Sequence, residues 1–240
     1  MYLSTGVLCA YSQISREGEV LARMKTRVSK REALAYHAQG KPGKIAVNIT
    51  KPCATWRDLS LACSPGVAEP VREIVRDPDE VFQYTARGNL VAVVTNGTSV
   101  LDLGNVGPLA AKPAMESKAV LFKRFADIDA FDIELDAEEP AEVVRVIRAL
   151  APTFGGINLV GVQAPDCFMI EDELQESLDI PFFHDDHSSI AIVVGAGLLN
   201  GFQIAGKSMS EARVVVNGAG AAGTACARLA LKLGVLKEHL

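Results

Sequence analysis

Hydrophobic residues recur along the chain with two different periods, which together indicate alternating strands and helices. Short apolar or alternating runs are typical of strands, whereas apolar positions spaced three and four apart indicate the buried stripe of a helix. The strand pattern occurs at residues 44–49, 89–95, 130–136, 154–160, 180–183 and 213–216, and the helical pattern at 55–63, 68–75, 113–125, 140–150, 165–178 and 224–233. This alternation predicts an α/β fold with a largely parallel sheet.

Two of these strands carry further local predictions. Asn96-Gly97 directly follows residues 89–95, and this pair favours a tight hairpin turn because both residues tolerate positive φ. Residues 99–103 would then return as an antiparallel partner strand. Residues 130–136 alternate strictly between apolar and acidic side chains, which predicts a strand with one face toward solvent.

Composition excludes several classes of function. The net charge of −5 argues against a general nucleic-acid binder, which needs a basic surface. The longest apolar run, residues 190–199, is too short to span a membrane, and no signal peptide begins the chain, so we expect a cytoplasmic protein. Five cysteines without C-x-x-C spacing indicate reduced thiols, most of them buried: Cys9, Cys53, Cys63, Cys167 and Cys226.

The stretch His184-Asp185-Asp186-His187 gathers carboxylates and imidazoles where a predicted strand ends. Ligands of open α/β sheets bind outside the carboxyl ends of strands, and carboxylates there suit Mg²⁺ or Mn²⁺. The alternative is structural: Asp186 caps the following helix and Asp185 interacts favourably with its dipole. One such cluster cannot fill an octahedral shell, so a metal site would need a second source of ligands.

A glycine-rich loop follows residues 213–216, a strand pattern, and precedes a helical one. Gly218, Gly220 and Gly223 have the spacing of a dinucleotide-binding turn, in which glycines allow the pyrophosphate to approach a helix N-terminus. The alternative, a packing turn, fits this strand–loop–helix context less well. The next strand, with the acidic residue that normally stands at its end about 20 residues later, does not follow before Leu240, so we expect a truncated nucleotide-binding unit.

Lysine and cysteine side chains offer further candidates. Lys112 and Lys118 lie at or near one helix start, where a lysine in a partly apolar pocket can act as a base, although solvated surface lysines are the simpler interpretation. Cys63 lies at a helix break before Ser64-Pro65-Gly66 and could be a nucleophile only with a partner base. No Cys–His arrangement supports that role, which favours a buried thiol.

Taken together, these motifs resemble the malic enzyme family in its bacterial form, from about residue 33 to the end of the chain. The resemblance is carried by Lys51-Pro52, Arg57-Asp58-Leu59, Ser64-Pro65-Gly66-Val67-Ala68, the run at 84–93, Asn96-Gly97-Thr98, Phe131-Asp132-Ile133-Glu134, the run at 152–159, Phe183-His184-Asp185-Asp186 and the run at 218–222. It implies a malic-enzyme N-terminal domain followed by the first βα unit of a Rossmann domain.

The resemblance also implies a function and a set of site residues. The family converts malate to pyruvate and CO₂ with NAD or NADP and a divalent metal, Mg²⁺ or Mn²⁺. Lys118 stands at the position of the family's general base, and Asp186, with Asp185 beside it, at that of a metal ligand. The residues at the position of the cofactor loop are Gly218, Ala219, Gly220, Ala221, Ala222 and Gly223.

This sequence departs from the family at several of these positions. Cys63 replaces the tyrosine acid, and Val160 and Gly161 replace a Glu-Asp pair of metal ligands. After His-Asp-Asp the family reads Gln-His-Gly-Thr-Ala, whereas residues 187–191 of this chain read His-Ser-Ser-Ile-Ala, so that Ile190 stands in place of the family's threonine. Losing the acid alone would lower the rate about 10²–10⁴-fold.

Two hypotheses about function therefore remain, with a third less favoured. The first is a malic enzyme that takes malate as its substrate, and the second is a non-catalytic homologue or fragment that acts as a binding or subunit-partner module. The third is a different decarboxylating enzyme with Cys63 as nucleophile. We expect residues 1–32 to be an extension, 33–186 the substrate domain and 187–240 the connecting helix and truncated Rossmann domain, in a homodimer without nucleic-acid or membrane partners.

Overall fold

The computed structural model describes residues 28–240, so most of the expected extension, residues 1–32, lies outside the described residues. The chain forms two units, residues 1–43 and 44–240. In the described part of the first, helix α2 (Lys30–Ala38) begins at Ser29. The Ser29 hydroxyl accepts from the Glu32 backbone N–H, and the Glu32 carboxylate accepts from the Ser29 N–H, which forms a capping box.

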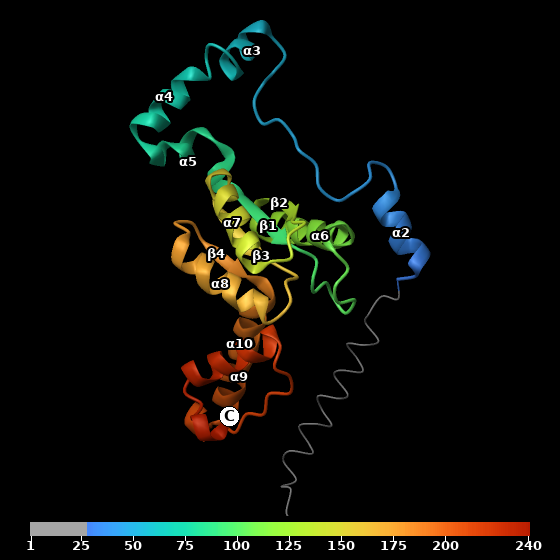
Figure 1. Ribbon diagram of the computed structural model, residues 1–240, viewed down its shortest axis with the longest axis vertical. Coiled ribbons are helices and arrows are strands. Elements are labelled where there is room, and N and C mark those ends of the chain that lie inside the picture. Colours follow the sequence, from blue (N-terminus) through green and yellow to red (C-terminus); the bar gives the residue numbers. More distant parts are fainter. Residues whose placement is uncertain (1–27) are drawn as a thin grey trace, which may run out of the picture. The chain divides into compact units, whose positions relative to one another are not determined.

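The second unit begins with short helices and continues as alternating strands and helices (Figure 1). Its helices and strands are α3 (Trp56–Ala62), α4 (Ala68–Arg76), α5 (Val81–Tyr84), β1 (Leu90–Thr95), α6 (Pro108–Ala126), β2 (Asp129–Glu134), α7 (Pro140–Leu150), β3 (Gly156–Leu159), α8 (Asp166–Ser177), β4 (Phe182–His184), η4 (Asp185–Ser189), α9 (Ile190–Ala205) and α10 (Ala221–Lys232). The segment η4 is a single turn of π-helix, and short 3₁₀ turns connect several of the other elements. Most of the predicted helices are confirmed within a few residues of their ends.

Strands β1 to β4 form one sheet in the order β2-β1-β3-β4, and every neighbouring pair is parallel. Val94 of β1 is level with Ile133 of β2 and Leu159 of β3, and Leu159 is level with His184 of β4. The predicted α/β fold with a parallel sheet is therefore confirmed. This register also brings the carboxyl ends of all four strands to the same edge.

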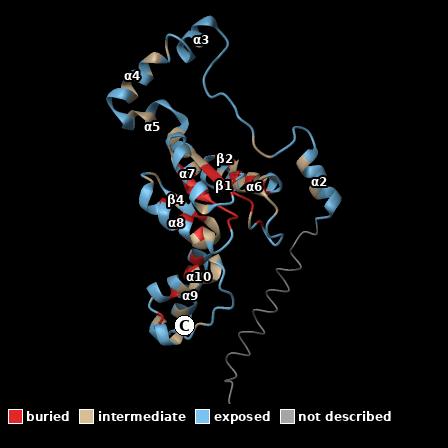
Figure 2. Cartoon of the chain, in the orientation of Figure 1, coloured by how far each residue is buried: buried red, intermediate tan, exposed pale blue. Residues whose placement is uncertain are grey.

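Helices cover both faces of the sheet, and the buried residues concentrate there (Figures 1 and 2). One face carries α7 and α8 and holds the larger core, which includes Val94, Ile147 and Leu174. The other face carries α6, where Val93 and Met115 pack with Val160. Because side chains alternate along β1, its residues serve the two cores in turn.

The predicted hairpin at Asn96-Gly97 is wrong. Both edges of β1 are already paired with parallel strands, so residues 99–103 cannot lie beside it. They form a loop instead, in which the Ser99 N–H donates to the Gly161 carbonyl at 2.9 Å. Gly97 still has positive φ, at +73°, and its lack of a side chain allows this loop to lie close to Gly107, whose carbonyl would be 2.3 Å from a Cβ at Gly97.

Three other strand predictions need correction. Residues 44–49 and 213–216 have no strand partner in the part of the chain that the structure describes, so their apolar patterns do not become strands. In β2 the acidic face predicted to meet solvent lies beneath α6 instead, and Asp132 is buried there. Lys112 of α6 compensates that burial by pairing with the two acidic side chains of β2.

Helix α9 continues directly from η4, so that Asp185–Ala205 is one helical run of 21 residues. By length and composition this run would suffice to cross a membrane, so the expectation that no apolar run is long enough is wrong. A single such helix is weak evidence for a span, and the expectation of no membrane partner stays a prediction. Gly195 lies against α10, where a Cβ would come within 2.7 Å of a Leu229 methyl carbon. The absence of a side chain at Gly195 therefore allows α9 and α10 to pack closely.

Candidate active site

The candidate site lies at the carboxyl edge of the sheet, where β4 passes into η4. Asp185 and Asp186 are the first two residues of this turn, directly after His184 of β4. The carboxyl end of β3 is the neighbouring position, since Leu159 and His184 are paired in the sheet. Residues that follow β3, Val160 and Gly161, therefore lie close to the two aspartates.

Lys118 reaches this edge from α6 and forms an ion pair between its Nζ and Oδ2 of Asp185. The Asp185 side chain is mostly buried, whereas about a third of the Lys118 side chain is exposed. The structure thus brings together two of the residues that the sequence singled out. The ammonium group neutralises a carboxylate that burial would otherwise penalise.

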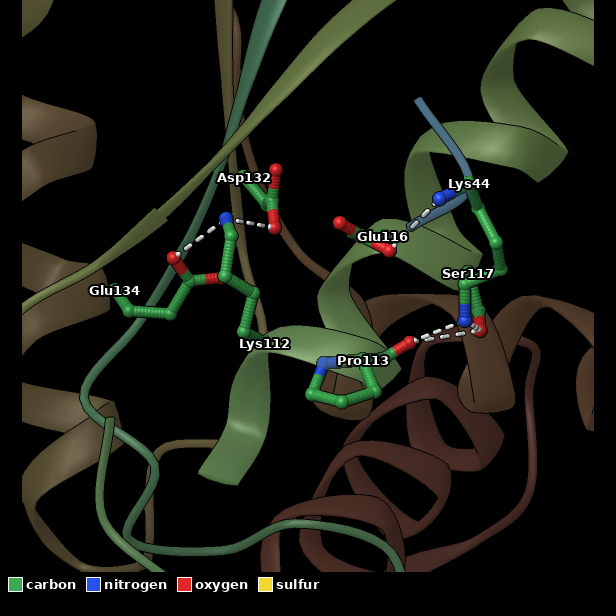
Figure 3. A network of polar contacts seen from close by, with 7 residues as sticks. All are labelled: Lys44, Lys112, Pro113, Glu116, Ser117, Asp132 and Glu134. Atoms are coloured by element: carbon green, nitrogen blue, oxygen red, sulfur yellow. Dashed lines mark hydrogen bonds and ion pairs between the residues drawn. The ribbon is translucent and has the colours of Figure 1, made fainter. Parts of the chain in front are cut away.

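Two lysines attach the part of helix α6 that precedes Lys118 (Figure 3). Lys112 lies between Asp132 and Glu134 of β2, with Nζ 2.6 Å and 3.1 Å from the two carboxylates. Burial raises the pKa of Glu134, as does the neighbouring Asp132, while Lys112 acts in the opposite direction. Lys112 therefore stabilises the buried Asp132 and the partly buried Glu134 and anchors the start of α6 on the sheet.

Lys44 makes the second attachment (Figure 3). Its Nζ donates to the Pro113 carbonyl at 2.6 Å and to the Ser117 hydroxyl at 2.8 Å, and its backbone N–H donates to the Glu116 carboxylate at 3.0 Å. These contacts hold the segment directly before Lys118. The position of the candidate base is therefore fixed from two directions.

Asp186 does not cap the helix that follows it, so the structural alternative read from the sequence is wrong. Its Oδ2 accepts a hydrogen bond of 2.7 Å from the backbone N–H of Gly161, across the carboxyl ends of β3 and β4. Gly161 has φ of +68°, a conformation that L side chains rarely adopt, and Val160 is buried against Met115. Neither residue has a side chain that can bind a metal.

Cys63 is exposed at the C-cap of α3, which contradicts the interpretation as a buried thiol. Cys53 is exposed as well, and only Cys167 is buried among the four cysteines that the structure describes. No hydrogen bond of the described residues joins the Cys63 side chain to Lys118 or Asp185. The geometry gives Cys63 neither a partner base nor a place beside the aspartates.

The glycine loop leads into α10, which begins at Ala221, three residues earlier than predicted. Gly218 has φ of +126°, and a Cβ at Gly223 would lie 2.1 Å from the Gly218 carbonyl oxygen, so the turn requires both glycines. Gly220 is the N-cap, so that Ala221, Ala222 and Gly223 present the first backbone N–H groups of the helix. Such a helix start can accept a pyrophosphate.

Sequence reasoning missed Glu171, which lies on the buried face of α8 between the two imidazoles. Its Oε2 is 2.9 Å from Nδ1 of His184 and 2.8 Å from Nδ1 of His187. Burial raises the pKa of Glu171, but the hydrogen bonds from both histidines outweigh it and hold the pKa below its usual value. The sequence did contain one sign of this role: Glu171 lies on the apolar stripe of its helix, one turn from Cys167 on one side and Leu174 on the other.

Comparison with known proteins agrees with this geometry. Residues 42–142 match the family model described as malic enzyme, N-terminal domain. The chain is 54% identical over 218 residues to the NADP-dependent malic enzyme of Rhizobium meliloti, covering 91% of this chain and 29% of the relative. It is also 54% identical over 209 residues to an NAD-dependent malic enzyme of the same organism, covering 87% and 27%.

A solved structure shows the same relation. The crystal structure of malic enzyme from Pyrococcus horikoshii has a TM-score of 0.84 and 49% identity, and the match covers 86% of this chain and 48% of that chain. The chain thus spans less than half the length of each of these relatives. From sequence and structure together, the chain belongs to the malic enzyme family, whose N-terminal domain model matches residues 42–142.

Proposed function

We propose that the protein acts on malate in the manner of a malic enzyme, by oxidative decarboxylation to pyruvate and CO₂ with NAD or NADP. The observation that carries this proposal is the pairing of Lys118 with Asp185, beside Asp186, at the carboxyl edge of a parallel sheet. The relatives named NADP- and NAD-dependent malic enzymes support the substrate and the nicotinamide cofactor. We place the protein in the cytoplasm, as a homodimer.

Lys118 is proposed as the general base that takes the proton from the malate hydroxyl. A base must present a neutral amine, so Lys118 has to leave its ion pair and lose its proton before it accepts another. Its position about three turns into α6, with Lys112 and Lys44 holding the helix, keeps the amine at the sheet edge. The backbone N–H groups at the start of α10 are the proposed contact for the cofactor's pyrophosphate.

A divalent metal is implied by the family, and the donor set for it is small but chemically suitable. Asp185 and Asp186 are adjacent oxygen donors, and Mg²⁺ or Mn²⁺ is often held by one or two carboxylates with the remaining positions filled by water and substrate. A bound ion would supply polarisation of the malate oxygens. One oxygen of each carboxylate already has a partner, the Lys118 ammonium for Asp185 and the Gly161 N–H for Asp186, so the other oxygens are the proposed donors to the ion.

A second candidate function is that of a non-catalytic homologue that binds malate or a partner subunit. It is favoured by Val160 and Gly161, which offer no metal ligands, and by Cys63, which lies exposed where the family has its tyrosine acid. The proposed domain limits, 33–186 and 187–240, apply equally to both candidates. The candidates differ only in whether turnover occurs.

The test is malate-dependent formation of NADH or NADPH by the protein in the presence of Mn²⁺. We expect turnover that falls about 10²–10⁴-fold in Lys118→Ala. The matched control is Lys123→Ala, an exposed lysine on the same helix that pairs only with surface aspartates, and it should leave turnover unchanged. Malate binding without turnover in the wild-type protein would replace the first candidate with the second.

A further inference from the structure

A buried group of three side chains lies on the α8 side of η4, apart from the Lys118–Asp185 pair. Glu171 of α8 contacts His184 at the end of β4 and His187 in η4, and one ligand atom from each lies within 4.8 Å of the others. His184 and Glu171 are buried, and His187 is mostly so. We refer to these residues as the Glu171 cluster.

Hydrogen bonding alone leaves the Glu171 cluster incompletely satisfied. If each ring donates from Nδ1 to Glu171, both Nε2 atoms are bare acceptors, and both are buried without a partner among the described residues. If the protons are on Nε2 instead, two Nδ1 lone pairs face a carboxylate. In the first arrangement both Nδ1 atoms and the Glu171 carboxylate converge on one point, where a bound cation would take the place of the two shared protons, while the two Nε2 atoms lie outside that point.

The surroundings are acidic as well. Burial raises the pKa of Cys167 to about 11, and the charges of Glu171, Asp186 and Asp166 add to that rise. Cys167 is one helical turn before Glu171 on α8. Several carboxylates therefore act on the same interior region, which favours a cation and disfavours an anion.

We propose that Glu171, His184 and His187 bind a divalent transition metal, with Zn²⁺ as the best match. Two imidazoles and one carboxylate are a common zinc ligand set, and they leave a fourth position open. In a tetrahedral site with bonds of about 2.0–2.1 Å, neighbouring ligand atoms lie about 3.3 Å apart. The present separations of 2.8 Å and 2.9 Å require each imidazole to move by only about half an ångström from Glu171.

The π-helical turn is what makes this ligand set possible. It directs Asp185 to α6 and Asp186 to the end of β3, while His187 turns back toward α8. Turns of π-helix inside longer helices frequently occur at functional sites. The proposed zinc site is thus separate from the aspartate pair, and neither depends on the other for its ligands.

The experiment is titration of the metal-free protein with Co²⁺ as a spectroscopic substitute for Zn²⁺, followed by competition with Zn²⁺. We expect one equivalent to give the intense visible absorption of a four-coordinate site, whereas Co²⁺ at the aspartate pair would be octahedral and absorb only weakly. His187→Gln removes a direct ligand, so it should weaken binding by more than the roughly 10–100-fold that loss of an orienting partner costs, while the amide keeps a polar contact to Glu171. His239→Gln, a histidine remote from Glu171 in sequence, is the matched control and should bind as the wild-type protein does.

Two further variants separate this site from other metal-binding groups. Binding should persist in Asp186→Asn, and it should persist in the double variant Cys53→Ser/Cys63→Ser, which removes the exposed thiols. A folded His187→Gln protein, judged by circular dichroism, that still binds Co²⁺ as tightly as wild type would overturn the proposal. The absence of stoichiometric Co²⁺ binding, or a thiolate charge-transfer band that disappears in the cysteine variant, would overturn it as well.

Discussion

Replacement of Lys112 by methionine removes the cation between Asp132 and Glu134 while keeping a side chain of similar length. The Asp132 side chain is only 1% exposed, so the change leaves a buried carboxylate without its counter-ion. Breaking a fully buried pair costs about 3–5 kcal/mol, but the Lys112 side chain is 45% exposed and solvent already screens part of the interaction. We therefore expect a loss of about 2 kcal/mol in the free energy of unfolding.

The loss should depend on pH. Lys112 lowers the pKa of Glu134, which burial and Asp132 raise, so the variant should have a still higher folded-state pKa at Glu134. Protonation then favours the folded variant, and the deficit should shrink as the pH falls from about 8 toward about 4, the unfolded value for glutamate. In the wild-type protein burial lowers the pKa of Lys112, but the hydrogen bonds that its ammonium donates to Asp132 and Glu134 outweigh burial and raise it. The contribution of Lys112 to stability is therefore lost only as the pH rises above about 10.

The assay is urea unfolding followed by circular dichroism at about pH 8 and about pH 5, with thermal melts as a second measure. A loss of about 2 kcal/mol corresponds to a melting temperature about 4–8 °C lower for a chain of this size. Lys123→Met on the same helix is the control, because Lys123 and both of its aspartate partners are exposed, and it should show no measurable change. A Lys112→Met variant as stable as wild type, or equally destabilised at both pH values, would refute the reasoning.

Three other predictions concern the sheet edge and the thiols. Iodoacetamide at about pH 8 should label Cys53 and Cys63 well before Cys167, whose burial raises its pKa to about 11, and peptide mass spectrometry would measure the order. Asp186→Ala should lower the free energy of unfolding by about 1.5–3 kcal/mol, because the Gly161 N–H loses a charged acceptor. Asp186→Asn keeps an acceptor and should lose less than half as much. Equal losses in the two variants would contradict the role of Asp186 as the acceptor for Gly161. Gly161→Asp should lower the free energy of unfolding by about 1–2 kcal/mol, because φ is +68° at this position. If the new carboxylate joins the aspartate pair, Mn²⁺ should raise the melting temperature of this variant more than that of the wild-type protein. Thermal melts with and without Mn²⁺ would measure both effects.

Much of the fold could be predicted because local patterns determined it. The alternation of apolar runs gave the parallel sheet, and proline at the start of Pro140–Leu150 marked the beginning of a helix whose apolar stripe is buried. Asn96-Gly97 misled because hairpin propensity is local, whereas the partners of β1 are decided by distant segments on both of its edges. The acidic positions of β2 misled for the same reason, since Lys112 lies some twenty residues away in sequence.

The candidate site was predicted only in part. The sequence pointed to Lys118, Asp185 and Asp186, and the structure brings them to one edge, but only tertiary structure shows that Asp186 binds a backbone N–H instead of capping a helix. Glu171 lies thirteen residues before His184 and carries no motif of its own, so its contact with two histidines follows only from the packing of α8 against β4. The one local sign that Glu171 has a buried partner was its position among buried apolar residues of α8.

The turn η4 has a consequence for how this protein can change over evolution. Three successive side chains of one turn reach three different parts of the domain: Asp185 reaches α6, Asp186 reaches the end of β3, and His187 reaches α8. Inserting or deleting a single residue directly before Asp185 would rotate all three side chains away from their partners by roughly a quarter of a turn at once. Substitution of individual side chains is therefore the accessible route for altering this edge, whereas a change in its length would break all three contacts in one step.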